Sequence, residues 1–355
     1  DVRLSRGLGD VYKRQFLTTD EKERYQKHLT LKEIGYEGQL SLKNSSVLCI
    51  GAGGLGSSVL LYLAAAGIGK IGIVDNDYVE KSNLQRQIIH ETNTIGSLKI
   101  DSAQERIKKF NPNSELLTFA ERINPKNALE IIQKFDIICD CSDNFGTRYL
   151  INDACLILNK PLVFGSVQGF EGQVSVFNLN KTSPNLRDLL PESPSKNTVP
   201  SCAEYGVVGV STGLIGIIQV NEIIKIILKK GEVLDGKIMV FDLLNMNTKK
   251  LHLKSDQVNK QINNLSKFMD YYSDDECSTQ TGTINRINAC DFNSLYKIKP
   301  NKILLIDVRE NEEFSASAID GSISLPLSHL NQKPDLEFIQ KESLIKEVFL
   351  SLIHI

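Results

Sequence analysis

The sequence lacks an excess of either charge. Its 355 residues carry 41 Lys and Arg against 43 Asp and Glu, a formal net charge of -2. Broad electrostatic binding to nucleic acid depends on a concentrated basic surface that neutralises phosphates. No such surface is evident in the sequence, so we expect no nucleic-acid partner.

The sequence also lacks a regular cysteine framework. It has seven cysteines, an odd number, and no two of them are spaced as C-x-x-C. Disulfide-stapled secreted proteins have even, closely patterned cysteines, so this usage indicates a reducing compartment, and we expect the cytoplasm. Structural zinc needs four thiolate or imidazole ligands, usually supplied as two close pairs, so zinc is not expected.

Long uninterrupted hydrophobic runs are missing as well. The longest, Val207 to Val220, is broken by glycines and leads into Glu222 and Lys225, so we expect no membrane span. The first residues carry four basic side chains without an apolar core, so they are not a secretory signal. We expect residues 1–20 to be a non-native or disordered leader, and the closing run 350–355 to be foreign sequence too.

The order of segments after this leader predicts an α/β fold. A buried strand at Ser46–Ile50, a glycine turn, a helix at Ser57–Ala66 and a second strand at Lys70–Asp75 make a βαβ unit. Strands and helices continue to alternate, and after Gly172 the pattern changes to antiparallel strands with a long helix at Ser211–Lys229. We therefore expect a Rossmann-like doubly wound sheet over residues 21–254.

The remainder of the chain divides in two by composition. Residues 255–282 are polar with few apolar anchors, which predicts a linker. Residues 283–355 form a second, incomplete α/β domain with a strand at Lys302–Asp307. Because its sheet would be incomplete, we expect Ile303, Leu305 and Leu325 to be poorly covered.

The glycine turn Gly51-Ala-Gly-Gly-Leu-Gly56 has the G-x-G-x-x-G spacing between a strand and a helix. In that context its N–H groups and the helix N-terminus can face a nucleotide. Asp75 ends the next strand, where an acidic residue meets a ribose hydroxyl in Rossmann-like sites. These features alone fit a nicotinamide-dependent oxidoreductase equally well.

Basic residues just beyond the strand ends favour a different chemistry. Asn83, Arg86 and Lys99 follow the second strand, and a dinucleotide fold requires no such basic pair. Cleavage between the α and β phosphates builds negative charge on pyrophosphate, which Arg and Lys are suited to hold. Asp140 and Asp143 close a later strand, where a carboxylate can hold Mg²⁺ against phosphates.

These motifs resemble the MoeB/ThiF family of E1-like adenylyltransferases over about residues 21–254. The resemblance also includes Arg24-Tyr25, Gly172–Phe177 and the Ser201-Cys-Ala-Glu204 segment. From about Thr283 the chain resembles a rhodanese domain, through Leu305–Arg309, Glu313-Phe314 and Ile319-Asp-Gly321. Together the two parts resemble MoeZ-type fusions.

The resemblance implies a homodimer that uses ATP and Mg²⁺ to adenylylate the C-terminal Gly-Gly tail of a ubiquitin-like sulfur-carrier protein. By motif it implies that Arg86, Lys99, Asp143 and Cys202 are catalytic, with Asp143 the metal ligand. The implied nucleotide-binding residues are Gly51, Gly53, Gly54, Gly56, Asp75, Asp77, Asn83, Gln87 and Asn144. Cys202 is either a residue that links covalently to the carrier or an inert cysteine.

Three departures from the family pattern stand out. Asn185 and Asp188 occupy the place of the first C-x-x-C pair that holds structural zinc in many members. Lys27 stands where many relatives have an Arg, so the charge is kept but the forked geometry is lost. No cysteine follows Cys290, so the rhodanese-like part lacks the loop cysteine that would carry a persulfide, and we expect no sulfur transfer through it.

Two other functions are compatible with parts of this pattern. An NAD-dependent oxidoreductase would leave Arg86 and Lys99 as ordinary surface residues. A non-catalytic scaffold that binds a ubiquitin-like protein would bind ATP without exchanging pyrophosphate. The choice of carrier lies in surface complementarity that the sequence does not reveal.

Overall fold

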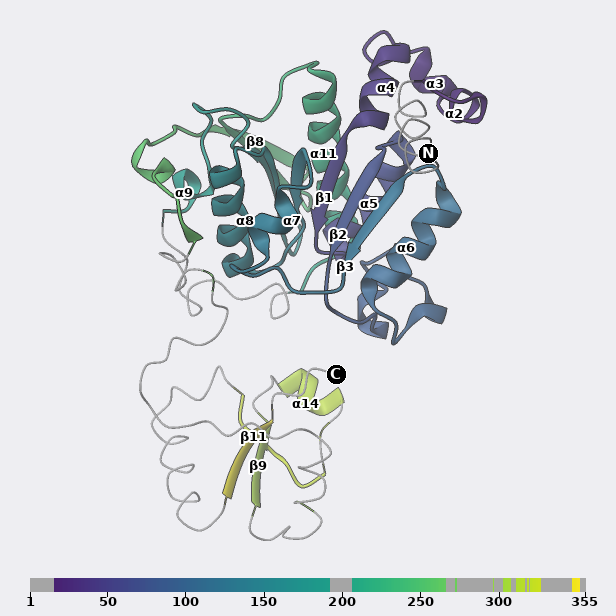
Figure 1. Cartoon of the computed structure of the whole chain (residues 1–355). Helices are drawn as coiled ribbons and strands as arrows, with labels where there is room; N and C mark the ends of the chain where they lie inside the picture. Colours follow the sequence, from purple (N-terminus) through teal and green to yellow (C-terminus); the bar gives the residue numbers. More distant parts are fainter. Residues whose placement is uncertain are drawn as a thin grey trace. The chain divides into compact units, whose positions relative to one another are not determined.

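The protein consists of two compact units, residues 1–276 and 277–355 (Figure 1). The computed structural model describes residues 16–191, 206–265, 272, 296, 303–307, 311–316, 318, 320–326 and 347–351. Cys202, Cys277 and Cys290 lie outside these residues, and so do the predictions that concern them.

An eight-stranded sheet in the order β3-β2-β1-β4-β5-β6-β7-β8 forms the centre of the first unit. The strands from β3 to β5 are parallel and the last three are antiparallel. Their bounds are β1 Ser46–Ile50, β2 Lys70–Val74, β3 Glu115–Phe119, β4 Ile137–Asp140, β5 Leu162–Gln168, β6 Glu171–Phe177, β7 Lys237–Asp242 and β8 Asn247–His252. The sheet is parallel up to β5 and antiparallel from β6, which confirms the predicted change to antiparallel strands after Gly172.

Helices cover both faces of this sheet, as expected for a doubly wound fold (Figure 1). On β1 the side chains alternate: Val47 and Cys49 pack with the helices of one face, and Leu48 and Ile50 with those of the other. The first face carries α5 Gly54–Ala66, α6 Lys99–Phe110 and α11 Gly209–Leu228, and the second carries α7 Ala128–Ile132, α8 Phe145–Leu158 and α9 Leu186–Leu189.

Short helices precede the sheet: α2 Thr19–Arg24, α3 Gln26–Leu29 and α4 Gly35–Asn44. Leu17 is buried and Thr18 caps α2 with a reciprocal hydrogen bond to Glu21. Residues 16–20 of the stretch expected to be a leader therefore belong to the folded unit, and residues 1–15 lie outside the described residues.

Helix α11 is, among the described residues, the one helix long and apolar enough to cross a membrane. Its contacts explain the composition differently, because it packs on α5, β5 and β6 and buries Ile215, Val220 and Ile223 in the core. These contacts account for the apolar residues on the face of α11 that packs on sheet and helix.

Part of the expected linker belongs to the first unit. Ile262, Leu265 and Tyr272 are buried, and the last two join the core cluster of α7 and α8. The sequence made this segment look like a linker because its few apolar residues are widely spaced, although Ile262, Leu265 and Tyr272 are anchors.

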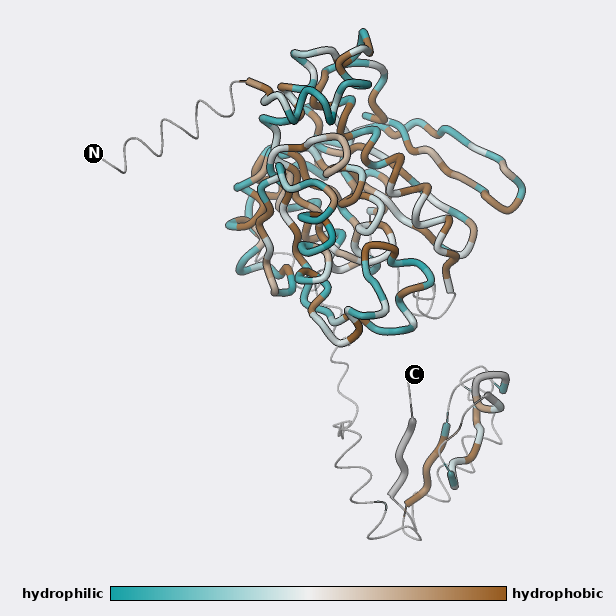
Figure 2. The backbone as a smooth tube through the Cα atoms, turned by 90° about the vertical axis from the view of Figure 1, so that its right-hand side faces the viewer, coloured by the Kyte–Doolittle hydropathy of each residue, from teal (hydrophilic) through white to brown (hydrophobic). Residues whose placement is uncertain are grey.

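The second unit contains a three-stranded parallel sheet in the order β10-β9-β11. Its described elements are β9 Ile303–Asp307, α14 Asn311–Ala316, β10 Ile323–Ser324 and β11 Glu347–Ser351. The hydrophobic strand β9, brown in Figure 2, is buried throughout, so the expectation that Ile303 and Leu305 are poorly covered is wrong. Strand β11, whose residues include part of the closing run expected to be foreign, pairs with β9 along its whole length.

Candidate nucleotide-binding site

A pocket lies at the carboxyl ends of the parallel strands, where β1, β2 and β4 end side by side. Ligands of open α/β sheets bind at this edge. The pocket brings together most of the residues named from the sequence: Gly51, Gly53, Gly54, Asp75, Asp77, Arg86, Gln87, Lys99, Asp143 and Asn144.

The glycine turn is held tightly against the neighbouring strand. Gly51 has φ +100°, and a Cβ there would lie 2.7 Å from the Cys141 carbonyl oxygen, so only glycine fits. Asp75 fixes the turn from the other side, because its Oδ2 accepts the Ala52 N–H at 2.8 Å and its Oδ1 accepts the Asp77 N–H at 2.8 Å. Burial raises the pKa of Asp75, and the charge of Lys99 and these two bonds oppose that rise.

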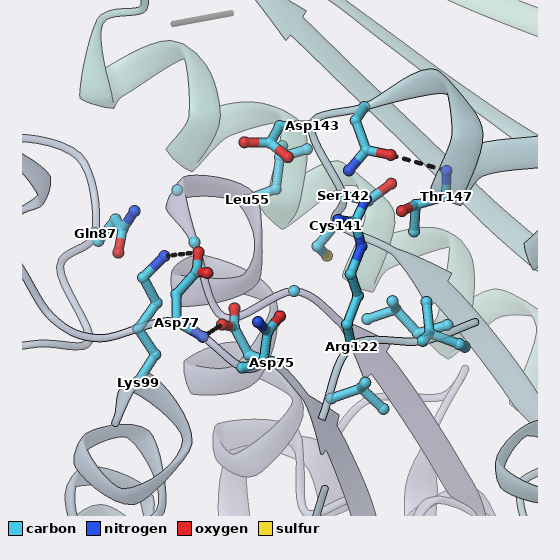
Figure 3. A pocket seen from close by; sticks show the side chains of 18 of the residues that line it. Leu55, Asp75, Asp77, Gln87, Lys99, Arg122, Cys141, Ser142, Asp143 and Thr147 are labelled. Atoms are coloured by element: carbon cyan, nitrogen blue, oxygen red, sulfur yellow. Dashed lines mark hydrogen bonds and ion pairs between the residues drawn. The ribbon is translucent and has the colours of Figure 1, made fainter. Parts of the chain in front are cut away.

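Lys99 is the first residue of α6, and its side chain is almost fully buried at the pocket wall. Its Nζ lies 2.8 Å from Oδ2 of Asp77, which is largely exposed (Figure 3). Arg86 is fixed differently, since its guanidinium donates to the Ser82 carbonyl at 3.0 Å. Gln87 is buried, and its Oε1 has no hydrogen-bond partner within the described chain, so this amide is available to a ligand.

The loop between β4 and α8 presents Asp143 and Asn144 to the pocket. Asp143 is exposed, whereas Asn144 caps α8 by accepting the Thr147 N–H at 2.8 Å. Asp140 is fully buried, and its Oδ1 accepts both the N–H and the hydroxyl of Ser142. Burial raises the pKa of Asp140, with Arg148 opposing, so Asp143 is the carboxylate of this pair that fits a phosphate-bound Mg²⁺.

Two of the residues named from the sequence do not line the pocket. A Cβ on Gly56 would lie 2.0 Å from the Gly51 carbonyl oxygen, so this glycine lets helix and turn approach closely. Asn83 is buried, and its Oδ1 accepts the Glu80 N–H at 3.1 Å, which closes the turn that precedes Arg86. Both residues support the site from behind the pocket surface.

Several pocket residues were not named from the sequence, among them Arg122, Arg148 and Thr212. Arg122 reaches the pocket after β3, with Asp75 between it and Lys99 in the view of Figure 3. Arg148 is buried, donates to the Ser142 carbonyl at 3.0 Å and lies over the Phe164 ring. Thr212 approaches from α11. Arg148 follows the Asp-Asn motif by one helical turn and was detectable, whereas Arg122 depends on β3, which the sequence reasoning had not recognised.

The described cysteines are core residues, as predicted. Cys49, Cys139, Cys141 and Cys155 are all buried thiols. Burial raises the pKa of Cys139, Cys141 and Cys155, so these thiols stay protonated and are poor nucleophiles.

Asn185 and Asp188 form a polar clasp between two segments. They cap α9 reciprocally, and Asp188 Oδ1 accepts the Asp256 N–H at 2.8 Å and the Asn259 amide at 2.9 Å. Among the described residues no cluster of three or more His, Cys, Asp and Glu side chains is placed to hold a metal. The clasp joins residues 185–188 to residues 256–259 through these hydrogen bonds.

Comparison with known proteins places the site in a family. The model of the ThiF family matches residues 25–262. The chain is 41% identical to the probable adenylyltransferase/sulfurtransferase MoeZ of Mycobacterium tuberculosis, over 89% of this chain and 81% of that protein. It is 40% identical to the probable molybdopterin-synthase adenylyltransferase of Porphyra purpurea, over 92% of this chain and 85% of that one.

Solved structures agree on the fold. The crystal structure of E. coli MccB with ATP superposes with a TM-score of 0.59 at 20% identity, over 68% of this chain and 74% of that one. PaaA superposes with a TM-score of 0.59 at 21% identity, over 72% and 84%. Family model, relatives and fold agree, and the chain belongs to the ThiF family.

Proposed function

We propose that this protein is an ATP-dependent adenylyltransferase that activates the C-terminal glycine of a ubiquitin-like sulfur-carrier protein in molybdopterin biosynthesis. The observation that carries the proposal is the convergence of Arg86, Lys99 and the glycine turn on one pocket. A hydride-transferring site needs no basic groups at the phosphates, whereas pyrophosphate departure does. The names of the relatives supply the reaction class and the pathway.

The reaction needs no nucleophile from the protein. A carboxylate oxygen of the carrier attacks the α-phosphorus of ATP, the bond from that phosphorus to the β-phosphate bridging oxygen breaks, and the electron pair leaves with pyrophosphate. The products are an acyl adenylate and pyrophosphate. Catalysis then consists of holding the two reactants in line and stabilising the leaving charge.

The pocket residues divide this work by position. The glycine turn and the N-terminus of α5 offer backbone N–H groups to the phosphates, while Arg86 and Lys99 hold the charge that develops on pyrophosphate. The Asp77 carboxylate keeps the buried Lys99 ammonium paired before ATP arrives. Asp143 would hold Mg²⁺, which would neutralise part of the phosphate charge.

Exposed apolar residues in the turns after β5 and β7 support a protein as second substrate. Phe170, Leu244 and Met246 are 46%, 68% and 80% exposed, and the Phe170 carbonyl accepts the Leu243 N–H at 3.0 Å. These turns follow β5 and β7 at the end of the sheet where β1, β2 and β4 also end and where the pocket lies. A carrier docked there presents its tail along the edge, and Leu244→Asp with Met246→Asp is expected to raise the KM for carrier while leaving the KM for ATP unchanged.

A second copy of the chain fits the outer face of α11. Val210, Leu214 and Ile217 are 76%, 36% and 38% exposed and fall on one stripe of the helix at helical spacing. We expect a homodimer in analytical ultracentrifugation and a monomer after Val210→Asp with Ile217→Asp. A monomeric parent protein would remove this part of the proposal.

The test of the whole proposal is ATP–pyrophosphate exchange with a panel of purified carriers that end in Gly-Gly. Exchange is expected only with a carrier present, and a carrier without its last glycine serves as the matched control. ATP binding without exchange would identify a scaffold, and a difference spectrum with NADH would identify an oxidoreductase. Elemental analysis of the same preparation tests the expected lack of stoichiometric zinc.

A further inference from the structure

A buried histidine lies behind the pocket, outside the set of residues that line it. His90 is 5% exposed and follows the turn that carries Arg86 and Gln87, with its N–H donating to the Gln87 carbonyl at 3.1 Å. Nothing in the proposed chemistry uses it directly. A buried imidazole nevertheless needs partners for both ring nitrogens.

Both ring nitrogens of His90 contact walls of the pocket. Nε2 lies 3.0 Å from the carbonyl oxygen of Ala52 in the glycine turn, and Nδ1 lies 2.9 Å from Oγ of Ser102 in α6. A carbonyl oxygen only accepts hydrogen bonds, so Nε2 carries the proton and Nδ1 accepts from the Ser102 hydroxyl in the neutral ring. The imidazole therefore connects the glycine turn with the helix whose first residue is Lys99.

The bond to Ala52 controls the direction of a neighbouring N–H group. In a planar trans peptide the C=O and the following N–H point in opposite directions. Because His90 holds the Ala52 carbonyl, the Gly53 N–H points away from His90. Gly53 lines the pocket and precedes the first turn of α5, where N–H groups lack partners within the helix.

The same peptide segment is fixed on its other side by Asp75, which accepts the Ala52 N–H at 2.8 Å. Two side chains thus hold two successive peptide groups of the turn. A pre-oriented turn binds phosphate without first losing conformational freedom, which raises affinity.

We propose that His90 is a positioning residue that orients the Gly53 N–H for the nucleotide phosphates through its bond to the Ala52 carbonyl. This role deepens the proposed function, because it concerns the ATP site of that reaction. Burial and the nearby charge of Lys99 lower the pKa of His90, so the neutral ring that this role requires is the favoured one at neutral pH.

Two amide substitutions separate the two contacts of the ring. A glutamine amide reaches about as far as Nε2 of histidine, so His90→Gln preserves the bond to Ala52. An asparagine amide reaches only about as far as Nδ1, so His90→Asn preserves only the bond to Ser102. Ser102→Ala removes the bond from the ring to Ser102 and keeps the bond to Ala52; it also removes the 3.0 Å hydrogen bond between the hydroxyls of Ser102 and Thr94. His252→Asn, at an exposed position on the edge strand β8, is the matched control for a histidine substitution.

The experiment measures ATP binding to the full chain by calorimetry, alongside exchange kinetics and the thermal unfolding midpoint. His90→Asn is expected to weaken ATP binding about tenfold, the scale for one lost hydrogen bond, with the larger change in KM for ATP than in kcat. His90→Gln, Ser102→Ala and His252→Asn are expected to stay within about threefold of the parent, less than the effect of one such bond.

The proposal fails if His90→Asn binds ATP as the parent does, or if a folded His90→Gln is weakened as much as His90→Asn. Should His90→Asn not fold, an ATP affinity of folded His90→Gln reduced tenfold would overturn it, and parent-like affinity would support it. A parent protein that binds no ATP would overturn the proposed function and this role together, whereas unchanged variants of an ATP-binding parent overturn this role alone.

Discussion

At the scale of single residues, each of the two cations proposed to meet the phosphates is held by a neighbouring group. Lys99 and Arg86 are held by different partners, the Asp77 carboxylate and the Ser82 carbonyl. We predict that Lys99→Ala and Arg86→Ala each lower carrier-dependent pyrophosphate exchange about a hundredfold or more, as is usual when one electrostatic stabiliser is lost. The control is Arg106→Ala. Arg106 lies on the same helix as Lys99, and this substitution removes its exposed ion pair with Glu91. Exchange within a few-fold of the parent would exclude either residue from the phosphate site.

His90 also makes stability depend on pH. Burial lowers its pKa from 6.5, the bond to the Ala52 carbonyl opposes this, and the charge of Lys99 lowers it further. As the pH falls, the unfolded chain therefore binds a proton at His90 at a higher pH than the folded chain does. The stability that comes from the neutral ring is present above about pH 6.5 and is lost as the pH falls through the pKa of the folded state. We predict that the urea midpoint falls more steeply for the parent than for His90→Gln between about pH 7.5 and about pH 5.5. Equal slopes would contradict the lowered pKa.

At the scale of helices and strands, a buried ion pair joins three segments. Arg187 of α9 donates from Nε and Nη2 to the two oxygens of Asp153 in α8, at 3.0 and 2.7 Å, and Tyr272 donates to the same carboxylate at 2.6 Å. Asp153 is fully buried, so removing the cation leaves an uncompensated charge. We predict that Arg187→Leu lowers the free energy of unfolding by about 3 kcal/mol or more. The control is Arg106→Leu, which breaks an exposed ion pair and is expected to change the free energy of unfolding by less than about 1 kcal/mol. Equal effects of the two substitutions in urea titrations would contradict the prediction.

The elements that the sequence predicted well are those with a strong local signal. Helix α6 was predicted with its observed bounds, Lys99–Phe110, and the glycine turn was found from its spacing between a strand and a helix. Strand β3 was missed because its five residues are only half buried at the sheet edge and include Glu115 and Thr118, which weakens the apolar run. Arg122 and His90 were missed for a related reason, since their roles come from contacts with segments far away in the sequence that no local pattern encodes.

At the scale of the whole molecule, the nucleotide site lies entirely within the first unit, residues 1–276. A domain with its own core generally folds alone. We predict that a chain ending at Glu276 keeps carrier-dependent exchange within about threefold of the parent, because no described pocket residue is removed. Loss of exchange from a chain that is folded by circular dichroism would show that the second unit takes part in adenylylation.

The contact of α11 with the glycine turn has a consequence for when the protein becomes active. A Cβ on Gly54 would lie 3.0 Å from the Thr212 side chain, and the Ser58 hydroxyl lies 3.5 Å from the Thr212 carbonyl. Turn and helix are separated by more than 150 residues of chain, so the pocket is complete only after most of this unit has been synthesised. Nucleotide binds that finished form and no earlier one, and by mass action ATP in the cell then acts as a folding ligand as well as a substrate, drawing newly made chains toward the assembled domain.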